Sequence, residues 1–495
     1  MDRLTALDAS FLRVETPTAH MHVGWLAPLE LPPGAARLDA AALIDQIAGR
    51  LHLAPRFRQR LAEVPLGLAE AAWVDDPDFD LRRHIRVVEP PEPITRGELR
   101  ALTDRFLSGQ LARDRPLWEI LIVPRVRGAR AAVLGKVHHA MVDGIAAVEM
   151  GMVLFDLSPR AEQPEPVDWQ PQASAGALRI AADAVADGAV EQFRTMWRAA
   201  AAGLSPRRTL RVADTMRRAA FSMAEDAVQR APESYLNVPI GPRRTLATHT
   251  CSLERLLHLR QAAGVTLNDV VLAASAGALR RLAVEHRQDP HDLRVMVPVS
   301  VRADADAPDS GNRITFGFVE LPVSARTAAA RLAMIREQTE ELKSSGRIGG
   351  SDLLLRSTGL LPGALKGGLA RFAASPRLYN LTISNVPGPR VPLYAAGARV
   401  SAIYPVIPIP DRHALAIGVL TYDGGVHFAG YADRDALPGL RLSGVVSNAL
   451  TELEVSLGRR PRVQARARNP GHPAKVAEGV SGEKSPDGAR ARTSA

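Results

Sequence analysis

The stretch His138-His139-Ala140-Met141-Val142-Asp143-Gly144 follows directly on a largely apolar run from Ala131 to Val137. The run predicts a buried strand, and the two neighbouring imidazoles lie at its end, with a carboxylate four residues beyond the second one. Imidazole has an unperturbed pKa near neutrality, so a positioned histidine can remove a proton and later return it. The sequence therefore predicts that the chemistry of the protein takes place at this strand end.

The residues after Gly144 predict a helix, so the segment has a strand–turn–helix setting. The apolar face of this helix consists of Ile145, Val148, Met152 and Leu154. A purely structural interpretation makes Asp143 the N-cap of the helix and the histidine pair two polar residues at a strand end. Gly144 would let the chain turn tightly into the helix.

Strand-like and helix-like stretches alternate in two regions of the chain, which is typical of layered α/β domains. In the first region we expect strands at 21–31, 118–123 and 131–137, and helices at 41–51 and 98–113. In the second we expect strands at 294–301, 314–323, 379–385, 415–422 and 426–431, and helices at 266–285, 328–342 and 435–457. The predicted organisation is an N-terminal subdomain (1–160), a linker and helical connector (161–243), a C-terminal subdomain (244–458) and a disordered basic tail (459–495).

The net charge of +9 is concentrated at the C-terminal end of the chain. Residues 459–495 contain nine Lys or Arg and three Asp or Glu, so they contribute +6 and leave +3 for the rest. A nucleic-acid-binding protein carries its positive charge on a folded face with interleaved aromatic residues. Because aromatic residues make up only 4% of this chain, nucleic-acid binding is disfavoured.

Cysteine content and apolar patterning limit the class of protein further. The single cysteine, Cys251, excludes internal disulfides and is interpreted as a small packed residue. No apolar run approaches the ~18–20 residues of a membrane span, and the N-terminus lacks a signal-peptide pattern. We therefore expect a cytoplasmic protein.

Residues 196–223, within the Ala- and Arg-rich connector, mix apolar and cationic side chains. Such a mixture suits a helix that lies on an anionic lipid surface. A connecting helical pair packed on the body of the protein explains it equally well, and both interpretations stay open.

The HHxxxDG pattern at 138–144 resembles the signature of the CoA-dependent acyltransferase superfamily. Within it, the chain more closely resembles the bacterial wax ester synthase/diacylglycerol acyltransferases. Further blocks of that resemblance are LDASFL at 7–12, ETP at 15–17, HMHVG at 20–24, PLWE at 116–119, LNDVVLA at 267–273, PVSVR at 298–302, GNR at 311–313 and NVPGP at 385–389. These blocks occur in the family's order, between residue 4 and about residue 457.

The resemblance implies a fold of two chloramphenicol-acetyltransferase-like α/β subdomains that face each other across a central channel. It also implies transfer of a fatty acyl group from acyl-CoA to the hydroxyl of diacylglycerol or of a long-chain alcohol. Acyl-CoA would be a co-substrate, with no bound cofactor and no metal. Because both substrates are lipidic, we expect peripheral association with the inner face of the plasma membrane or with lipid droplets.

Within this family the second histidine is the general base, so the resemblance assigns that role to His139. His138 would support the geometry of the loop. Asp143 would face away from the substrate, orienting the loop by pairing with an arginine, for which Arg58 is a candidate. A thioester is already activated, so this chemistry needs a base and an oxyanion donor but no enzyme nucleophile.

Four further residues are candidates for positions near the site. Pro116 and Trp118 could line the acyl or acceptor channel, although a tryptophan at the start of a strand also suits the core. Asn268 and Asp269 could lie near the site or simply cap the helix that begins there.

Two other functions stay open on the sequence. One is a condensation-type acyltransferase that uses carrier-bound thioesters, and the other is a non-catalytic lipid-surface protein. The sequence does not separate diacylglycerol from fatty alcohol as the acceptor, because each methylene changes binding by only ~1–3 kcal/mol in an apolar pocket.

Overall fold

The computed structural model of the chain describes residues 2–64, 70–141, 150–151, 153–160, 169–172, 229–301, 313–344 and 363–458. Asp143 and Gly144 lie outside these residues. The stretch 196–223 and the predicted tail also lie outside them. The domain boundaries proposed from the sequence stay a prediction.

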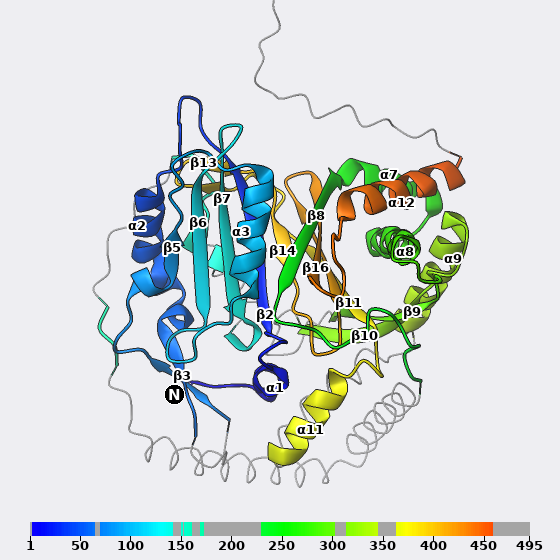
Figure 1. Ribbon diagram of the computed structural model, residues 1–495, viewed down its shortest axis with the longest axis horizontal. Helices are drawn as coiled ribbons and strands as arrows, with labels where there is room; N and C mark the ends of the chain where they lie inside the picture. Colours follow the sequence, from blue (N-terminus) through cyan, green and yellow to red (C-terminus); the bar gives the residue numbers. More distant parts are fainter. Residues whose placement is uncertain are drawn as a thin grey trace, which may run out of the picture. The chain divides into compact units, whose positions relative to one another are not determined.

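The first large sheet has seven strands, and most of it comes from the N-terminal half of the chain (Figure 1). Its centre consists of β2 (His22–Glu30), β7 (Arg130–His138) and β6 (Trp118–Val126), with β5 (Ile85–Val87) beyond β6. These bounds confirm the three strands predicted here. The helices α2 (Ala40–Arg50) and α3 (Arg96–Ser108) cover opposite faces of this sheet. Successive residues of β6 point to opposite faces, and they belong in turn to the apolar cluster that contains α2 and to the one that contains α3.

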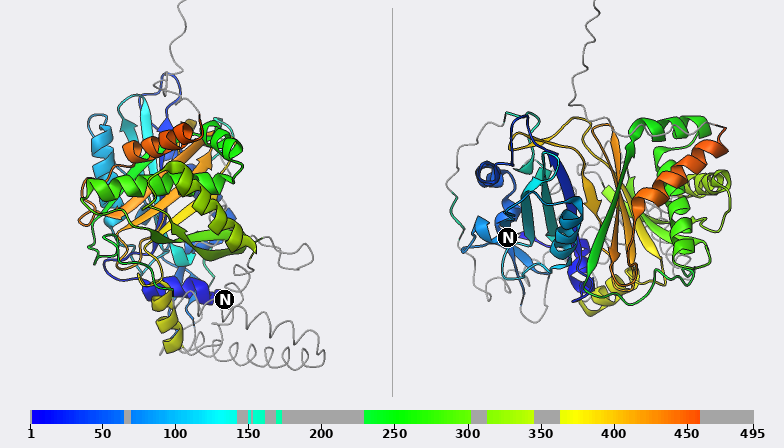
Figure 2. Two further views of the ribbon diagram at one scale, coloured as in Figure 1. Left: turned by 90° about the vertical axis from the view of Figure 1, so that its right-hand side faces the viewer. Right: turned by 45° about the horizontal axis from the view of Figure 1, so that its top comes forward.

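The second large sheet has six strands and comes from the C-terminal half. In spatial order they are β10 (Arg313–Leu321), β9 (Leu293–Val301), β11 (Leu381–Pro387), β15 (Leu415–Tyr422), β16 (Gly425–Asp433) and β8 (Arg244–Ser252). The helices packed beside it are α7 (Leu253–Ala263), α8 (Leu267–Glu285), α9 (Ala328–Ser344) and α12 (Leu442–Ser456). Figure 2 shows these helices gathered on one side of the sheet. The predicted mixed α/β class is confirmed.

Smaller elements accompany the two large sheets. A three-stranded sheet consists of β1 (Asp2–Arg3), β4 (Ala72–Asp75) and β3 (Gln59–Ala62). The helices α1 (Ala6–Val14) and α11 (Gly363–Ala373) pack on each other. Short 3-10 turns are η1 (Leu51–Leu53), η2 (Pro55–Arg58), η4 (Leu81–Arg83) and η5 (His139–Met141).

Two helices are shorter than the sequence predicts. The helix expected at 98–113 ends at Ser108, where the Nζ atom of Lys136 donates to the carbonyls of Phe106 (3.1 Å) and Gly109 (2.7 Å). The helix expected at 435–457 begins only at Leu442, because Pro438 and Gly439 interrupt it and Gly439 has a φ of +72°.

A segment of the C-terminal half crosses to the first sheet. It forms β12 (Tyr394–Ala395), β13 (Ala398–Val400) and β14 (Tyr404–Val406), and the last two pair with β2. β14 also contacts β15 and β16 of the second sheet. The approach is close, because a Cβ atom on Gly418 would lie 2.8 Å from the carbonyl oxygen of Pro405. The two sheets are therefore joined through β14.

A second junction of the sheets consists of buried polar groups between α3 and β8. The carboxylate of Asp104 accepts hydrogen bonds from the Leu246 amide (2.9 Å) and the Thr245 hydroxyl (3.0 Å). The Arg244 guanidinium pairs with Asp433 at 3.3 Å and also donates to the carbonyl of Thr18, just ahead of β2. Both side chains of that ion pair are at most 1% exposed.

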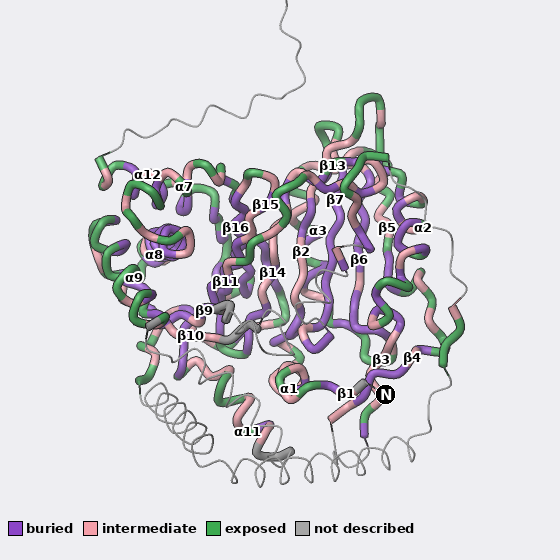
Figure 3. Tube along the Cα trace, turned by 180° about the vertical axis from the view of Figure 1, so that it is seen from behind, coloured by how far each residue is buried: buried purple, intermediate pink, exposed green. Residues whose placement is uncertain are grey.

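Most residues in the central strands of the two large sheets are buried, and these strands are purple in Figure 3. Cys251 is buried as expected, and burial raises the pKa of its thiol to about 12. Among the described helices none is by itself long and apolar enough to cross a membrane. The pair α7 and α8, bent by 103°, meets that length and composition test only when its two helices are taken together.

Candidate active site

The histidine pair lies where β7 ends and η5 begins. His138 lies opposite His22 in the antiparallel pairing of β7 with β2, and the amide of His139 donates to the carbonyl of Met21 at 2.8 Å. The alternation of the strand directs the His138 side chain to the same face as Lys136 and opposite to Val137. The backbone at the pair is thus held by the start of the neighbouring strand.

His138 is buried, with only 1% of the residue exposed. Its Nδ1 atom accepts a hydrogen bond from the Ala140 amide at 3.0 Å, so in the neutral ring the proton is on Nε2. The Nε2 atom lies 3.6 Å from Oε2 of Glu15. Burial, together with the charge of Arg113, lowers the pKa of His138 to about 3. A neutral, fixed imidazole of this kind suits support of the turn.

His139 is partly accessible, and its imidazole stacks on the Phe11 ring with centroids 3.8 Å apart and planes 14° from parallel. Its Nδ1 atom is buried and has no hydrogen-bond partner in the described part of the chain. The surrounding protein lowers the pKa of His139 to about 4, mainly through burial and secondarily through His138. The ring is therefore neutral at pH 7 and can accept a proton.

Glu15 is a residue of this site that the sequence did not single out. Its side chain is 5% exposed, and its carboxylate forms an ion pair with Arg113, which follows α3. It also lies 3.9 Å from Nε2 of His22, and it accepts from Gln110 at 3.4 Å. Glu15 belongs to one of the blocks of resemblance, but no local spacing connects it with a histidine more than a hundred residues away.

His20 and His22 are buried next to the pair. Their ring centroids are 5.4 Å apart, and those of His22 and His138 are 6.0 Å apart. Burial lowers the pKa of both His20 and His22, so these rings are neutral as well. Within the described ranges, no group of three or more His, Cys, Asp or Glu side chains is arranged to hold a metal ion.

Trp118 lies in the core behind the pair. It is 1% exposed, its indole N–H donates to the Phe57 carbonyl at 2.8 Å, and its ring stacks on His84 at 4.6 Å. Pro116 is buried close by, and its carbonyl accepts from the Trp118 amide. These contacts favour the core interpretation of both residues over a channel lining.

Arg58, the candidate partner of Asp143, lies with its guanidinium over the Trp169 ring, 4.9 Å from the centroid. Burial lowers the pKa of Arg58, and the nearby Asp75 opposes that effect. Since Asp143 and Gly144 lie outside the described residues, the pairing and the roles of both stay predictions.

The helix α8 begins at Leu267 with Thr266 as its N-cap, so Asn268 and Asp269 lie in its first turn. Asp269 forms a capping box with Thr266: the Thr266 amide donates to the carboxylate (2.8 Å), and the threonine hydroxyl accepts from the Asp269 amide (3.2 Å). The carboxylate also accepts from Thr339 (2.8 Å). The side-chain Oδ1 atom of Asn268 accepts a hydrogen bond from the side-chain amide of Asn385 at 3.4 Å. Asp269 thus has a complete structural role, whereas Asn268 reaches the strand β11.

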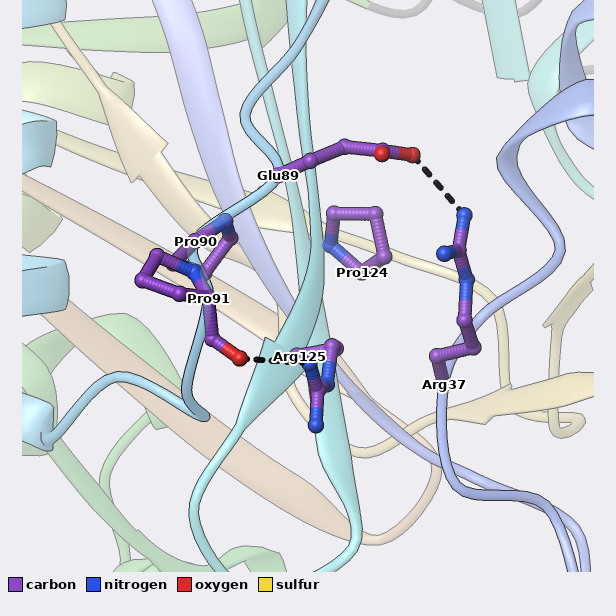
Figure 4. Close-up of a pocket in the computed structure, with 6 residues that line it drawn as sticks. All are labelled: Arg37, Glu89, Pro90, Pro91, Pro124 and Arg125. Atoms are coloured by element: carbon purple, nitrogen blue, oxygen red, sulfur yellow. Dashed lines mark hydrogen bonds and ion pairs between the residues drawn. The ribbon is translucent and has the colours of Figure 1, made fainter.

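A pocket of about 230 Å³ lies elsewhere (Figure 4). It is lined by Arg37, Glu89, Pro90, Pro91, Pro124 and Arg125. Arg37 pairs with Glu89 at 2.8 Å. The pocket lies at the far end of β6, whereas His138 lies beside the Trp118 end. At ~3.3 Å per residue the separation is roughly 20 Å, so the pocket is not part of the histidine site.

Two protein-family models match the chain. Residues 4–271 match the wax ester synthase/diacylglycerol acyltransferase catalytic domain, and residues 310–454 match the WS/DGAT C-terminal domain. A relative from Mycobacterium tuberculosis, described as a probable diacylglycerol O-acyltransferase, is 32% identical over 473 residues. The match covers 92% of this chain and 100% of that protein.

Solved structures agree on the fold. A wax ester synthase/diacylglycerol acyltransferase from Marinobacter aquaeolei is 28% identical, with a TM-score of 0.65 over 92% of this chain and 100% of that one. The starter condensation domain of rhizomide synthetase, solved with C8-CoA, is 15% identical and has a TM-score of 0.56 over 92% and 94% of the two chains. At that identity the second likeness concerns the fold alone, and it agrees with the two-subdomain architecture.

Proposed function

The chain belongs to the wax ester synthase/diacylglycerol acyltransferase family, and on that premise we propose that it transfers a fatty acyl group from acyl-CoA to the hydroxyl of diacylglycerol. The product is then triacylglycerol, and long-chain alcohols are a second class of acceptor that gives wax esters. The observation that carries the proposal is the neutral imidazole of His139, a residue of intermediate exposure held at the end of β7.

In the proposed reaction His139 removes the proton from the acceptor hydroxyl as its oxygen attacks the thioester carbonyl. An oxygen–carbon bond forms and the carbon–sulfur bond breaks. The proton then passes from His139 to the CoA sulfur, so the imidazole returns to its neutral form. No covalent enzyme intermediate is needed, because the thioester is already activated.

His138, Glu15 and Arg113 act through the turn and not on the substrate. Arg113 holds the Glu15 carboxylate, which faces the Nε2–H of His138, while Nδ1 of that ring accepts from the Ala140 amide inside η5. This series of contacts fixes the backbone that carries His139. Fixed geometry of this kind lowers the entropic cost of reaching the transition state.

The proposal is tested with purified protein and radiolabelled palmitoyl-CoA, offered diolein and hexadecanol side by side. We expect labelled triacylglycerol or wax ester on thin-layer chromatography, and the ratio of the two gives the acceptor preference. An acyl donor bound to a carrier protein is offered in parallel. Folded protein that forms no ester from palmitoyl-CoA with either acceptor would contradict the proposal.

Substitution of Glu15 by glutamine is expected to lower kcat by about 10- to 100-fold, because a misplaced base costs rate even when the base itself is intact. The glutamine side chain lacks the negative charge that pairs with Arg113 and faces the Nε2 atom of His138. Glu89→Gln, at the remote pocket, is the matched control and should keep wild-type turnover. Wild-type turnover in Glu15→Gln would show that the carboxylate does not hold the turn.

We also propose that the enzyme works while peripherally attached to a membrane or lipid-droplet surface, since both the acyl chain and the acceptor partition into lipid. The stretch 196–223 supplies apolar and cationic residues suited to an anionic lipid surface. Changing the arginines of this stretch to glutamine should move protein from the membrane to the soluble fraction of lysed cells. Unchanged partitioning would remove this stretch as the contact.

A further inference from the structure

The helix α1 supplies one contact to each histidine of the pair. Phe11 stacks on the His139 ring, and Glu15, the C-cap residue of α1, faces His138. Positions four apart lie on the same side of a helix, so the spacing of Phe11 and Glu15 explains why one helix end reaches both imidazoles. Packing between α1 and η5 agrees with this arrangement.

The helix is itself anchored at both ends. Thr5 caps its start by accepting from the Asp8 amide at 3.1 Å. Near its end Arg13 pairs with Glu70, and Glu70 also accepts from Lys366 of α11 at 3.2 Å. The backbone of α1 that carries Phe11 is therefore fixed in place. The near-parallel stacking of the Phe11 ring on the His139 ring restrains rotation of the imidazole.

We infer that Phe11 is a positioning residue for His139, holding the plane of the base and keeping water from one of its faces. The inference rests on the proposed function, because it takes His139 as the base. In this role Phe11 makes no contact with the reacting atoms of the acyl donor or the acceptor.

Removal of the stacked ring has two physical consequences. The imidazole gains rotational freedom, so fewer encounters have the nitrogen aligned with the acceptor hydroxyl. Water also reaches the ring, and a better-solvated imidazole titrates closer to its ordinary pKa of ~6.5 than to the present value of about 4. More of the base is then protonated at mildly acidic pH.

Other titratable and charged groups near His139 are unchanged by this substitution. His138 on β7 acts on it directly and lowers its pKa. His22 on β2, Glu15 after α1 and Arg113 after α3 lie around His138. A change in the titration of His139 in a Phe11 variant is therefore attributable to the lost ring.

The test compares Phe11→Leu with Phe11→Tyr, which keeps the aromatic face. For Phe11→Leu we expect kcat to fall about 10-fold with little change in the KM for palmitoyl-CoA. The acid limb of the kcat/KM profile should move up by about one pH unit or more. Phe11→Tyr should restore both quantities. The matched control is Phe79→Leu, because Phe79 is also half-buried and stacks on a histidine, His84, at 5.3 Å.

Unchanged kcat and an unchanged acid limb in Phe11→Leu would overturn the inference, as would an equal shift in Phe79→Leu. If Phe11→Leu does not fold, Phe11→Met is used for the same comparison, because methionine is close to leucine in volume and also lacks the ring. Failure of the inference differs from failure of the proposed function: in the first case His139→Ala is inactive while Phe11→Leu behaves as wild type, and in the second His139→Ala stays active.

Discussion

Replacement of His139 by alanine is expected to lower kcat for acyl transfer from palmitoyl-CoA to diolein by about 10²- to 10⁴-fold, the usual contribution of a positioned general base. The variant should fold, because alanine keeps the backbone hydrogen bond to Met21 and the Nδ1 atom has no partner among the residues described. The measurement is steady-state kinetics beside a thermal unfolding curve.

His258→Ala is the control for this substitution, since His258 lies on α7 and its side chain is 40% exposed. It should retain wild-type turnover. A His139→Ala variant with turnover near that of the wild type would remove His139 from the mechanism and, with it, the observation on which the proposed function rests.

Because the pKa of His139 is lowered, both activity and stability are expected to decrease as the pH is lowered. The neutral form is the base, so activity should persist well below pH 6 and fall as the pH approaches the folded-state pKa of about 4. Between that value and ~6.5 the unfolded chain takes up a proton that the folded chain does not, so stability decreases as the pH is lowered. His139→Ala should therefore lose less unfolding free energy between pH 7 and pH 5 than the wild type.

The largest expected effect on stability comes from Arg244. Arg244→Leu leaves the Asp433 carboxylate buried without its cation and removes the donor to the Thr18 carbonyl. Breaking a buried ion pair from one side costs about 3–5 kcal/mol. We expect the lower end of that range, because Asp433 keeps hydrogen bonds from the amides of Gly241 (2.8 Å), Asp435 (2.9 Å) and Ala436 (2.8 Å).

The neighbouring Arg243 provides the matched control. It pairs with Asp435, but these side chains are 63% and 48% exposed, and such a pair contributes about 0–1 kcal/mol. Urea unfolding of Arg243→Leu and Arg244→Leu should therefore differ by about 2 kcal/mol or more. Adding Asp433→Asn to Arg244→Leu should recover part of the loss. Equal destabilisation by the two arginine substitutions would show that the buried pair does not hold the junction.

The local elements and the family were determined by the sequence alone. Strand-like runs rich in apolar residues predicted β2, β6 and β7 to within a few residues, because such a run is visible in neighbouring residues alone. The start of α8 was likewise predicted to within a residue. Its N-cap is Thr266, with Asp269 as the capping-box partner, whereas the sequence had suggested Asn268 and Asp269 as the capping residues. The histidine pair was found because its residues are adjacent in the chain, and the ordered blocks of resemblance identified the family.

Tertiary structure alone decided which distant residues meet at the site and at the junction of the sheets. Phe11 and Glu15 reach the histidine pair only because α1 packs on η5, and no pattern within the first fifteen residues encodes that contact. Arg243 and Arg244 are identical in type and adjacent, yet one is exposed and the other is buried against Asp433. The physical reason is that burial and charge pairing depend on which surfaces pack together, and packing between elements far apart in sequence leaves no local period to read.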